Sequence, residues 1–408
     1  MSGLRGHLVD GAARRGVGDE RPGARGGVGG RSAADGVDWD GALRLARLAT
    51  PAGPRVPGAV GRGVVALLRR SAQDALPWAA QITGLGFAAR RAVGGCRVLV
   101  VDRVGVQRAN AAFARALMER VPEPSGSRSG ATAIASRSVA TGAVAGLLGL
   151  VSARVLGQVL PAGPGAGVVD GSGFEAAGDA AVAAVAPPGV DTAATRMLLV
   201  APNVLRLQRE RDLDRVDLAA WVALHEAAHV LQLAAAPWLA GHLATQVGEL
   251  AVALVGAPKA GGHRGPGRLA RALRSGVAAG PGAASPLLVD RLDAGERERL
   301  ASVTAVMALL EGHAEAVLDA VGPGRMPSVH RLRAVLGHSR GGAAGTALER
   351  LLGVEAKQAQ YVDGAAFVRA VVGRVGHAGL NVVWRAAANL PRPEEIARPE
   401  AWLERMGL

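Results

Sequence analysis

The hydrophobic and polar positions along most of this chain recur at the spacing of an α-helix. Residues 217–236 run without glycine or proline, which is enough for about five helical turns, and Asp217 is the expected N-cap. Two short runs rich in branched apolar residues, 97–102 and 197–204, are predicted strands, and Pro202 is expected to end the second one. The sequence therefore predicts a mainly α fold with a small β contribution, of the α+β class.

Two stretches lack this periodicity and suggest how the chain is organised. Residues 1–36 are rich in Gly, Arg and Asp and are predicted to be a disordered leader. Residues 161–195 form a low-complexity run of Gly, Ala, Pro and Asp, interpreted as an insertion into a single domain that spans 37–408. The insertion separates an N-terminal helical part with a short strand, 37–160, from a second helical part, 196–408, which carries the candidate chemistry.

Two features of composition raise the question of a membrane or a nucleic acid as partner. The apolar run 139–153 is shorter than the roughly 18 to 20 residues that a bilayer span needs, so a buried helix and no membrane span are expected. The net charge is +13, but the arginines are scattered and aromatic residues make up only 3% of the chain. Without a recognisable binding motif, this charge predicts no nucleic-acid partner.

Cysteine content and the N-terminal sequence bear on the compartment. The single cysteine, Cys96, excludes an intrachain disulfide and fits a reducing compartment. Because it adjoins an apolar run, it is expected to be a buried structural thiol. No apolar stretch of the secretory type follows the paired arginines near the N-terminus. We therefore expect a cytoplasmic protein.

The candidate chemistry begins with "HEAAH" at 225–229, inside the predicted helix that follows Asp217. His225 and His229 are four residues apart, so both can direct a ring nitrogen at one metal ion from the same helix face. Glu226, about 100° around the helix, would lie beside the metal and could take a proton from a zinc-activated water. The pattern also arises by chance in something on the order of one chain in a hundred, and two histidines on an alanine-rich face could equally be core residues bonded to backbone.

A catalytic zinc usually has three protein ligands, so a third one is needed. Cys96 lies far upstream in a strand context, and the sixth residue after His229 is Ala235 rather than the histidine of the metzincin pattern. The third ligand should therefore be a carboxylate on a second helix.

The segment 306–322 supplies carboxylates at i, i+4 and i+8 on one face of an otherwise apolar helix: Glu311, Glu315 and Asp319. Glu311 is the candidate ligand. Glu315, one turn further on, could accept a hydrogen bond from the far nitrogen of a ligand histidine and fix its tautomer. The alternative is a solvated acidic stripe on an amphipathic helix.

Three further residues are weaker candidates. Tyr361, the single tyrosine, could donate a hydrogen bond to an oxyanion, or it could be a half-buried tyrosine bonded to a carbonyl. His313 lies about 200° from Glu311 around the helix, which indicates a role behind the ligands or a structural one. His242 could line a cleft or simply be packed.

"HEAAH" together with "LLEGHAEAV" about eighty residues later resembles the gluzincin arrangement, in which two histidines and a downstream glutamate hold zinc. The ordered blocks between residues 37 and 405 also resemble the zincin-like family of metallopeptidases and hydrolases, one branch of which is labelled as associated with biosynthesis of the deazaflavin coenzyme F420. The resemblance implies His225, His229 and Glu311 as zinc ligands and Glu226 as general base.

Two functions follow from this interpretation. The first is a zinc metallopeptidase or related hydrolase that cleaves a peptide or small amide substrate. The second is a zinc-binding but non-hydrolytic accessory or scaffold protein associated with the deazaflavin coenzyme pathway. The presence of Glu226 and the lack of a convincing fourth protein ligand favour hydrolysis, since structural zinc sites are normally closed by four. A metal-free helical protein is the third possibility.

Overall fold

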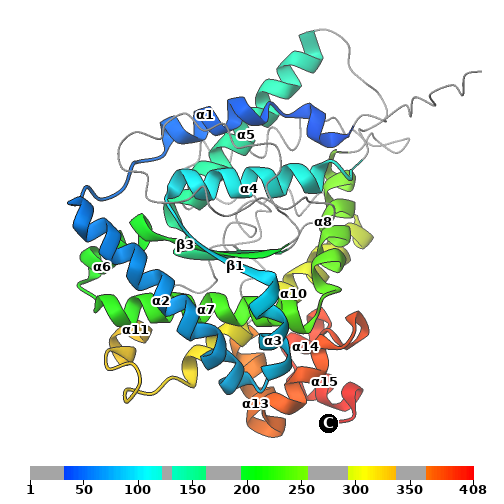
Figure 1. The fold of residues 1–408 in the computed structure, drawn as a ribbon. Coiled ribbons are helices and arrows are strands. Elements are labelled where there is room, and N and C mark those ends of the chain that lie inside the picture. Colours follow the sequence, from blue (N-terminus) through cyan, green and yellow to red (C-terminus); the bar gives the residue numbers. More distant parts are fainter. Residues whose placement is uncertain (1–31, 122–130, 162–193, 256–292, 337–363) are drawn as a thin grey trace, which may run out of the picture.

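A computed structural model describes residues 32–121, 131–161, 194–255, 293–336 and 364–408 (Figure 1). Helices dominate these residues, and the strands form one small sheet, so the predicted mainly α class is confirmed. In chain order the elements are η1 (Ala33–Gly36), α1 (Trp39–Ala49), α2 (Gly58–Thr83), α3 (Gly86–Gly95), β1 (Cys96–Val101), α4 (Arg103–Met118), α5 (Ala131–Arg154), β2 (Gly157–Leu160), β3 (Thr195–Val200), α6 (Ala201–Arg211), α7 (Arg215–Ala235), α8 (Leu239–Val255), α10 (Ala294–Asp319), α11 (Val329–Leu336), α13 (Gly364–Leu380), η4 (Asn381–Trp384), η5 (Ala387–Asn389), α14 (Pro393–Ile396) and α15 (Pro399–Met406).

The sheet has three strands in the order β1-β3-β2. β1 runs parallel to β3, and β2 runs antiparallel to it with Gly157 opposite Leu199. The first predicted strand is confirmed to within one residue. The second ends earlier than predicted, because Ala201 already begins α6 and Pro202 lies in its first turn, where a missing N–H costs no hydrogen bond. The short edge strand β2 was not predicted.

Both faces of the central strand β3 are covered, because its alternate side chains point to opposite sides. Met197 and Leu199 pack into the main hydrophobic core with α2, α3, α7 and α10. Leu198 and Val200 pack on the other side with apolar residues of α4. Figure 1 shows this arrangement, with α1, α4 and α5 above the sheet and α2 and α7 below it.

Helix α7 runs through the main core, and most of its residues are buried. Its N-cap is Asp214, whose carboxylate accepts hydrogen bonds from the backbone N–H groups of Val216 and Asp217, so the predicted cap at Asp217 is one turn too late. The Asp217 carboxylate instead accepts from the backbone N–H and the hydroxyl of Ser328, both at 2.7 Å. This contact ties the start of α7 to the segment that precedes α11.

The chain is already ordered before the predicted start of the domain at residue 37. Residues 33–36 form η1, Ala34 is buried, and the Trp39 indole N–H donates to the Ala34 carbonyl. The predicted leader was therefore too long at its C-terminal end, while residues 1–31 and most of the predicted insertion lie outside the described part. Cys96 is half-buried, and burial raises the pKa of its thiol to about 11.

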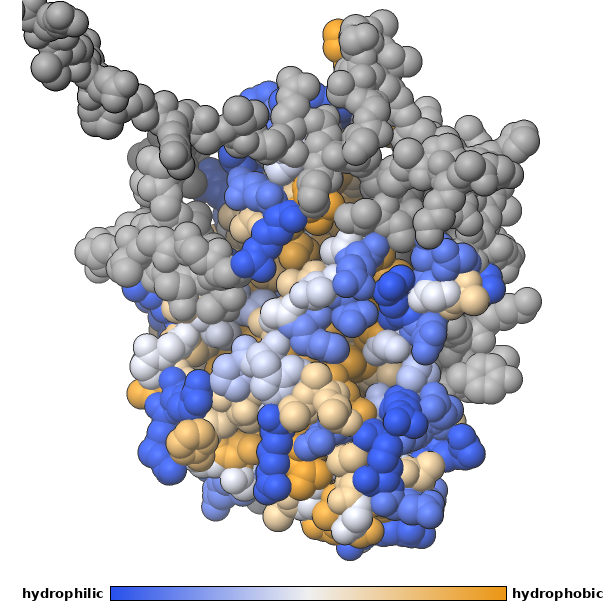
Figure 2. All heavy atoms as spheres, turned by 90° about the vertical axis from the view of Figure 1, so that its right-hand side faces the viewer, coloured by the Kyte–Doolittle hydropathy of each residue, from blue (hydrophilic) through white to orange (hydrophobic). Residues whose placement is uncertain are grey.

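Three described helices are long and apolar enough to cross a membrane by length and composition: Ser136–Arg154 within α5, and the whole of α7 and α10. The apolar windows of α7 and α10 are 67% and 61% buried in the interior, against 28% for α5. The helix predicted at 139–153 is thus buried along one side only, through residues such as Ala145 and Leu148. On the face in Figure 2, hydrophilic residues lie between the hydrophobic ones of the described part. The absence of a membrane span stays a prediction.

Candidate metal centre

Helices α7 and α10 bring His225, His229 and Glu311 together. The Nε2 atoms of the two histidines lie 3.2 Å apart. Glu311 Oε2 is 3.4 Å from His225 Nε2, and Oε1 is 3.7 Å from His229 Nε2. The three potential ligand atoms all lie within 4.8 Å of one another. A tetrahedral zinc ion with bonds of about 2.0–2.2 Å separates its ligands by about 3.3–3.6 Å, so the donor set fits such an ion in both chemistry and spacing.

A pair of glycines sets how closely α10 can approach its other neighbour, α13. Gly312 directly follows Glu311, and a Cβ on it would overlap the backbone of Gly364. A Cβ on Gly364 would in turn overlap the carbonyl of Ala308. A glycine therefore stands beside Glu311 because the backbones of α10 and α13 meet at that point.

Charges within the cluster shift the pKa values of both histidines. Burial disfavours the charged form of His225, but the hydrogen bond and negative charge of Glu311 outweigh this and raise the pKa of His225 to about 9. Burial lowers the pKa of His229, with the neighbouring His225 acting in the same direction. A metal ion bound at this cluster would have to replace the proton that the raised pKa keeps on His225.

Glu226 lies next to the ligand cluster and is only 5% exposed. Burial raises the pKa of its carboxyl group to about 7, and the charge of Glu311 adds to this shift while that of His225 opposes it. A general base works best with a pKa near the working pH. The Glu226 side chain is packed closely against β2, because a Cβ on Gly157 would lie 2.5 Å from Glu226 Cγ and 2.6 Å from Oε1.

Gln232 also belongs to the site, although the sequence reasoning missed it. Its side-chain oxygen Oε1 lies 2.9 Å from His229 Nδ1. Its Nε2 lies 2.8 Å from the carbonyl oxygen of Leu310 and 3.0 Å from His313 Nδ1. The signal in the sequence was a single polar residue three positions after the second histidine, in the otherwise apolar stretch "VLQLAAA".

Comparison with known proteins decides the family. The sequence model that describes the zincin-like metallopeptidase family matches residues 37–403 of this chain. The chain belongs to this family. The fold is similar to a crystal structure from Chloroflexus aurantiacus described as "a putative hydrolase with a novel fold", with 23% sequence identity, a TM-score of 0.57, and coverage of 91% of this chain and 99% of that one. A search of curated proteins found no match.

Membership of the zincin-like metallopeptidase family supports a function of the metallohydrolase type and implies a metal ion, usually zinc. In this zincin-like chain, the cluster of His225, His229 and Glu311 is the group of potential ligands found among the described residues.

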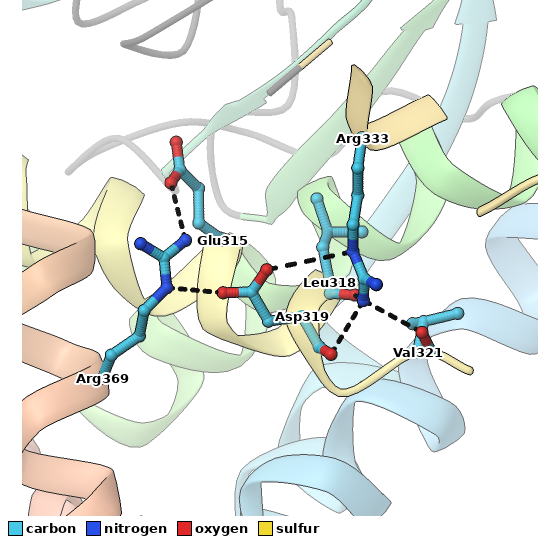
Figure 3. Close-up of polar contacts among 6 residues, drawn as sticks. All are labelled: Glu315, Leu318, Asp319, Val321, Arg333 and Arg369. Atoms are coloured by element: carbon cyan, nitrogen blue, oxygen red, sulfur yellow. Dashed lines mark hydrogen bonds and ion pairs between the residues drawn. The ribbon is translucent and has the colours of Figure 1, made fainter. Parts of the chain in front are cut away.

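Glu315 takes part in an ion-pair network with α13. Its carboxylate lies 3.7 Å from Nη2 of Arg369 on α13, and Arg369 Nε donates to Asp319 at 2.7 Å (Figure 3). Arg333 of α11 donates to the carbonyls of Leu318 and Asp319 at the end of α10 and to that of Val321 just beyond it. The far nitrogen of His229 is bonded to Gln232, so Glu315 is not its partner. A bond from Glu315 to the far nitrogen of His225 stays a prediction.

The remaining predicted residues of the zincin-like chain lie apart from the ligand atoms or outside the described part. His313 is fully buried, contacts Gln232, and has its pKa lowered to about 3 by burial and by the nearby histidines His377 and His229. His242 is half-buried on α8 and packs edge-on against Trp238. Tyr361 falls outside the described residues.

Proposed function

We propose that this chain is a zinc-dependent hydrolase that cleaves peptide or small amide bonds. The observation that carries the proposal is the position of the buried Glu226 carboxylate beside a set of three potential ligands. Three protein ligands leave a coordination position for water or substrate, whereas structural zinc sites use four. Within the described residues the ligand cluster has three members.

His225, His229 and Glu311 would hold the zinc ion, which when bound supplies a Lewis acid that polarises the substrate carbonyl and makes water more acidic. Glu226 takes the proton from the attacking water at a carboxylate oxygen and then delivers it to the leaving amine nitrogen. Burial suits the residue to both steps, because it raises the pKa of the carboxyl group and so favours the protonated form that carries the proton from water to the amine.

The outer edge of β2 supports an extended peptide as the substrate class. One side of β2 pairs with β3, and no strand in the described part of the chain pairs with the other side. Free backbone groups at a sheet edge can form hydrogen bonds with an added extended chain. Because Gly157 of β2 lies against Glu226, a peptide bound along this edge would pass close to the general base.

The test combines metal content with peptide cleavage. Glu226→Gln should retain zinc and lose cleavage of a quenched fluorescent peptide library by about 100-fold or more. His229→Ala should lose zinc itself, as measured by elemental analysis. Glu298→Gln, an exposed substitution on α10, serves as the matched control and should behave as the wild type.

Two results would contradict the proposal. Zinc retained stoichiometrically after replacement of both His225 and His229 would exclude the ligand set. Zinc bound by the wild type without any cleavage that depends on Glu226 would favour the accessory or scaffold protein.

A further inference from the structure

The side-chain amide of Gln232 can be placed in one orientation only. The Leu310 carbonyl, 2.8 Å from one end of the amide, can accept hydrogen bonds but cannot donate them. That end is therefore the NH2 group, and the oxygen faces His229 Nδ1 at 2.9 Å. His229 must then carry its hydrogen on Nδ1, which leaves a lone pair on Nε2, the atom that faces Glu311.

The contact between Gln232 and His313 has a defined donor and acceptor as well. Since the NH2 group of Gln232 is the donor, His313 Nδ1 at 3.0 Å must be the acceptor. The Gln232 NH2 group thus donates both hydrogens to α10, one to the Leu310 carbonyl and one to His313, while the amide oxygen accepts from His229 on α7. Gln232 and His313 are 1% and 0% exposed, so water does not compete for these bonds.

We infer that Gln232 is a positioning residue that sets His229 in the tautomer and ring orientation needed to bind the metal ion. The inference rests on the proposed function, because it requires His229 to be a ligand. It assigns Gln232 the place usually taken by a carboxylate or a carbonyl behind a ligand histidine. It also makes His313 and Leu310 the groups that hold the Gln232 amide and couple the two ligand-bearing helices.

A purely structural role makes a different prediction for substitutions. If Gln232 only fills space between α7 and α10, an apolar side chain of similar length should preserve both the fold and metal binding. If it positions His229, loss of the acceptor should weaken metal binding even where the fold is intact.

The experiment measures metal affinity and the visible spectrum of the Co²⁺ form for wild type, Gln232→Met and Gln232→Glu, with thermal unfolding in parallel. Gln232→Met removes the acceptor for His229 and should lower Zn²⁺ and Co²⁺ affinity by about 10- to 100-fold and change the Co²⁺ spectrum. Gln232→Glu keeps an acceptor but disturbs the contacts with α10, so it should retain affinity within about threefold while the melting temperature falls. Gln208→Met is the control, because it removes a similar bond to the Leu213 carbonyl away from the site.

Each outcome bears on one proposal. Absence of metal binding by the wild type contradicts the proposed function. Metal binding by the wild type together with unchanged affinity and spectrum in Gln232→Met overturns the positioning role alone. If Gln232→Met does not fold, Gln232→Glu decides: retained affinity supports the inference, and a loss of tenfold or more overturns it.

Discussion

Replacing Gly157 with alanine should damage catalysis without removing the metal. The added Cβ would lie 2.5 Å from Glu226 Cγ, 2.6 Å from Oε1 and 2.7 Å from Cδ. Gly157 is not among the glycines with positive φ, so the backbone itself accepts alanine. The contact with Glu226 is therefore the main perturbation.

The expected size follows from these distances. Carbon atoms in contact are normally about 3.5–4.0 Å apart, so the Glu226 side chain must move by about 1 Å or more. It has little free space, since it is 5% exposed. A misplacement of about 1 Å in a reacting group can cost on the order of 100-fold in rate. We expect kcat to fall by about that factor, with zinc content unchanged because no ligand is touched.

The assay measures kcat on a peptide that the wild type cleaves, together with zinc content. Gly142→Ala is a suitable control, because an added Cβ at that helical position meets nothing within 4 Å. It should leave kcat unchanged and stabilise α5 slightly. Wild-type kcat in Gly157→Ala would refute the proposed contact, and loss of zinc would show that the perturbation reaches the ligands.

Three further predictions concern protons and packing. Zinc affinity should rise by about tenfold per pH unit from pH 6 to 8. The reason is that the pKa of His225 is raised to about 9 beside Glu311, so His225 must lose a proton before it can bind the ion. Calorimetry in buffers of different ionisation enthalpy measures the number of protons released. Burial alone would raise the pKa of the Glu395 carboxyl, but the hydrogen bonds from Arg405 outweigh this and lower it. Arg405→Ala should therefore reduce the free energy of unfolding by about 3 kcal/mol at pH 7. This contribution is fully present above the unfolded pKa of Glu395, about 4.3, and is lost as the pH falls through the lower pKa of the folded state. Urea unfolding at pH 3 should therefore show a smaller stability difference between wild type and Arg405→Ala than at pH 7. Gly312→Ala should destabilise the protein by about 1–3 kcal/mol through overlap with α13 and weaken zinc binding, measured by thermal unfolding and a chelator competition.

The long helices and the first strand could be predicted because their patterns are local. The end of the second strand could not, since a proline that stops a strand and a proline in the first turn of a helix look alike in sequence. β2 has only four residues, and its partner β3 begins at Thr195, far along the chain. Its pairing is a tertiary contact that local propensity does not encode.

The ligand spacing was predictable for the same local reason, since helical period places His225 and His229 on one face. The partner of His229 was not. Gln232 and Glu315 were both polar residues close to the ligands in sequence, and the choice between them depended on the packing of α7 against α10. It depended also on Arg369 of α13, which pairs with Glu315 and lies more than fifty residues further along the chain.

The donors and the distances between them come from different kinds of residue. In the proposed site, His225, His229 and Glu311 would supply the metal-binding atoms, and the separation of those atoms depends on how closely α7, α10 and α13 pack. Gly312 permits the approach of α13 to α10, and Gln232 bonds α7 to α10. A ligand atom displaced by about 1 Å leaves the range of a zinc bond. A chain that kept the two histidines and the glutamate but replaced this glycine and this glutamine would therefore retain the motif while losing much of the affinity for zinc.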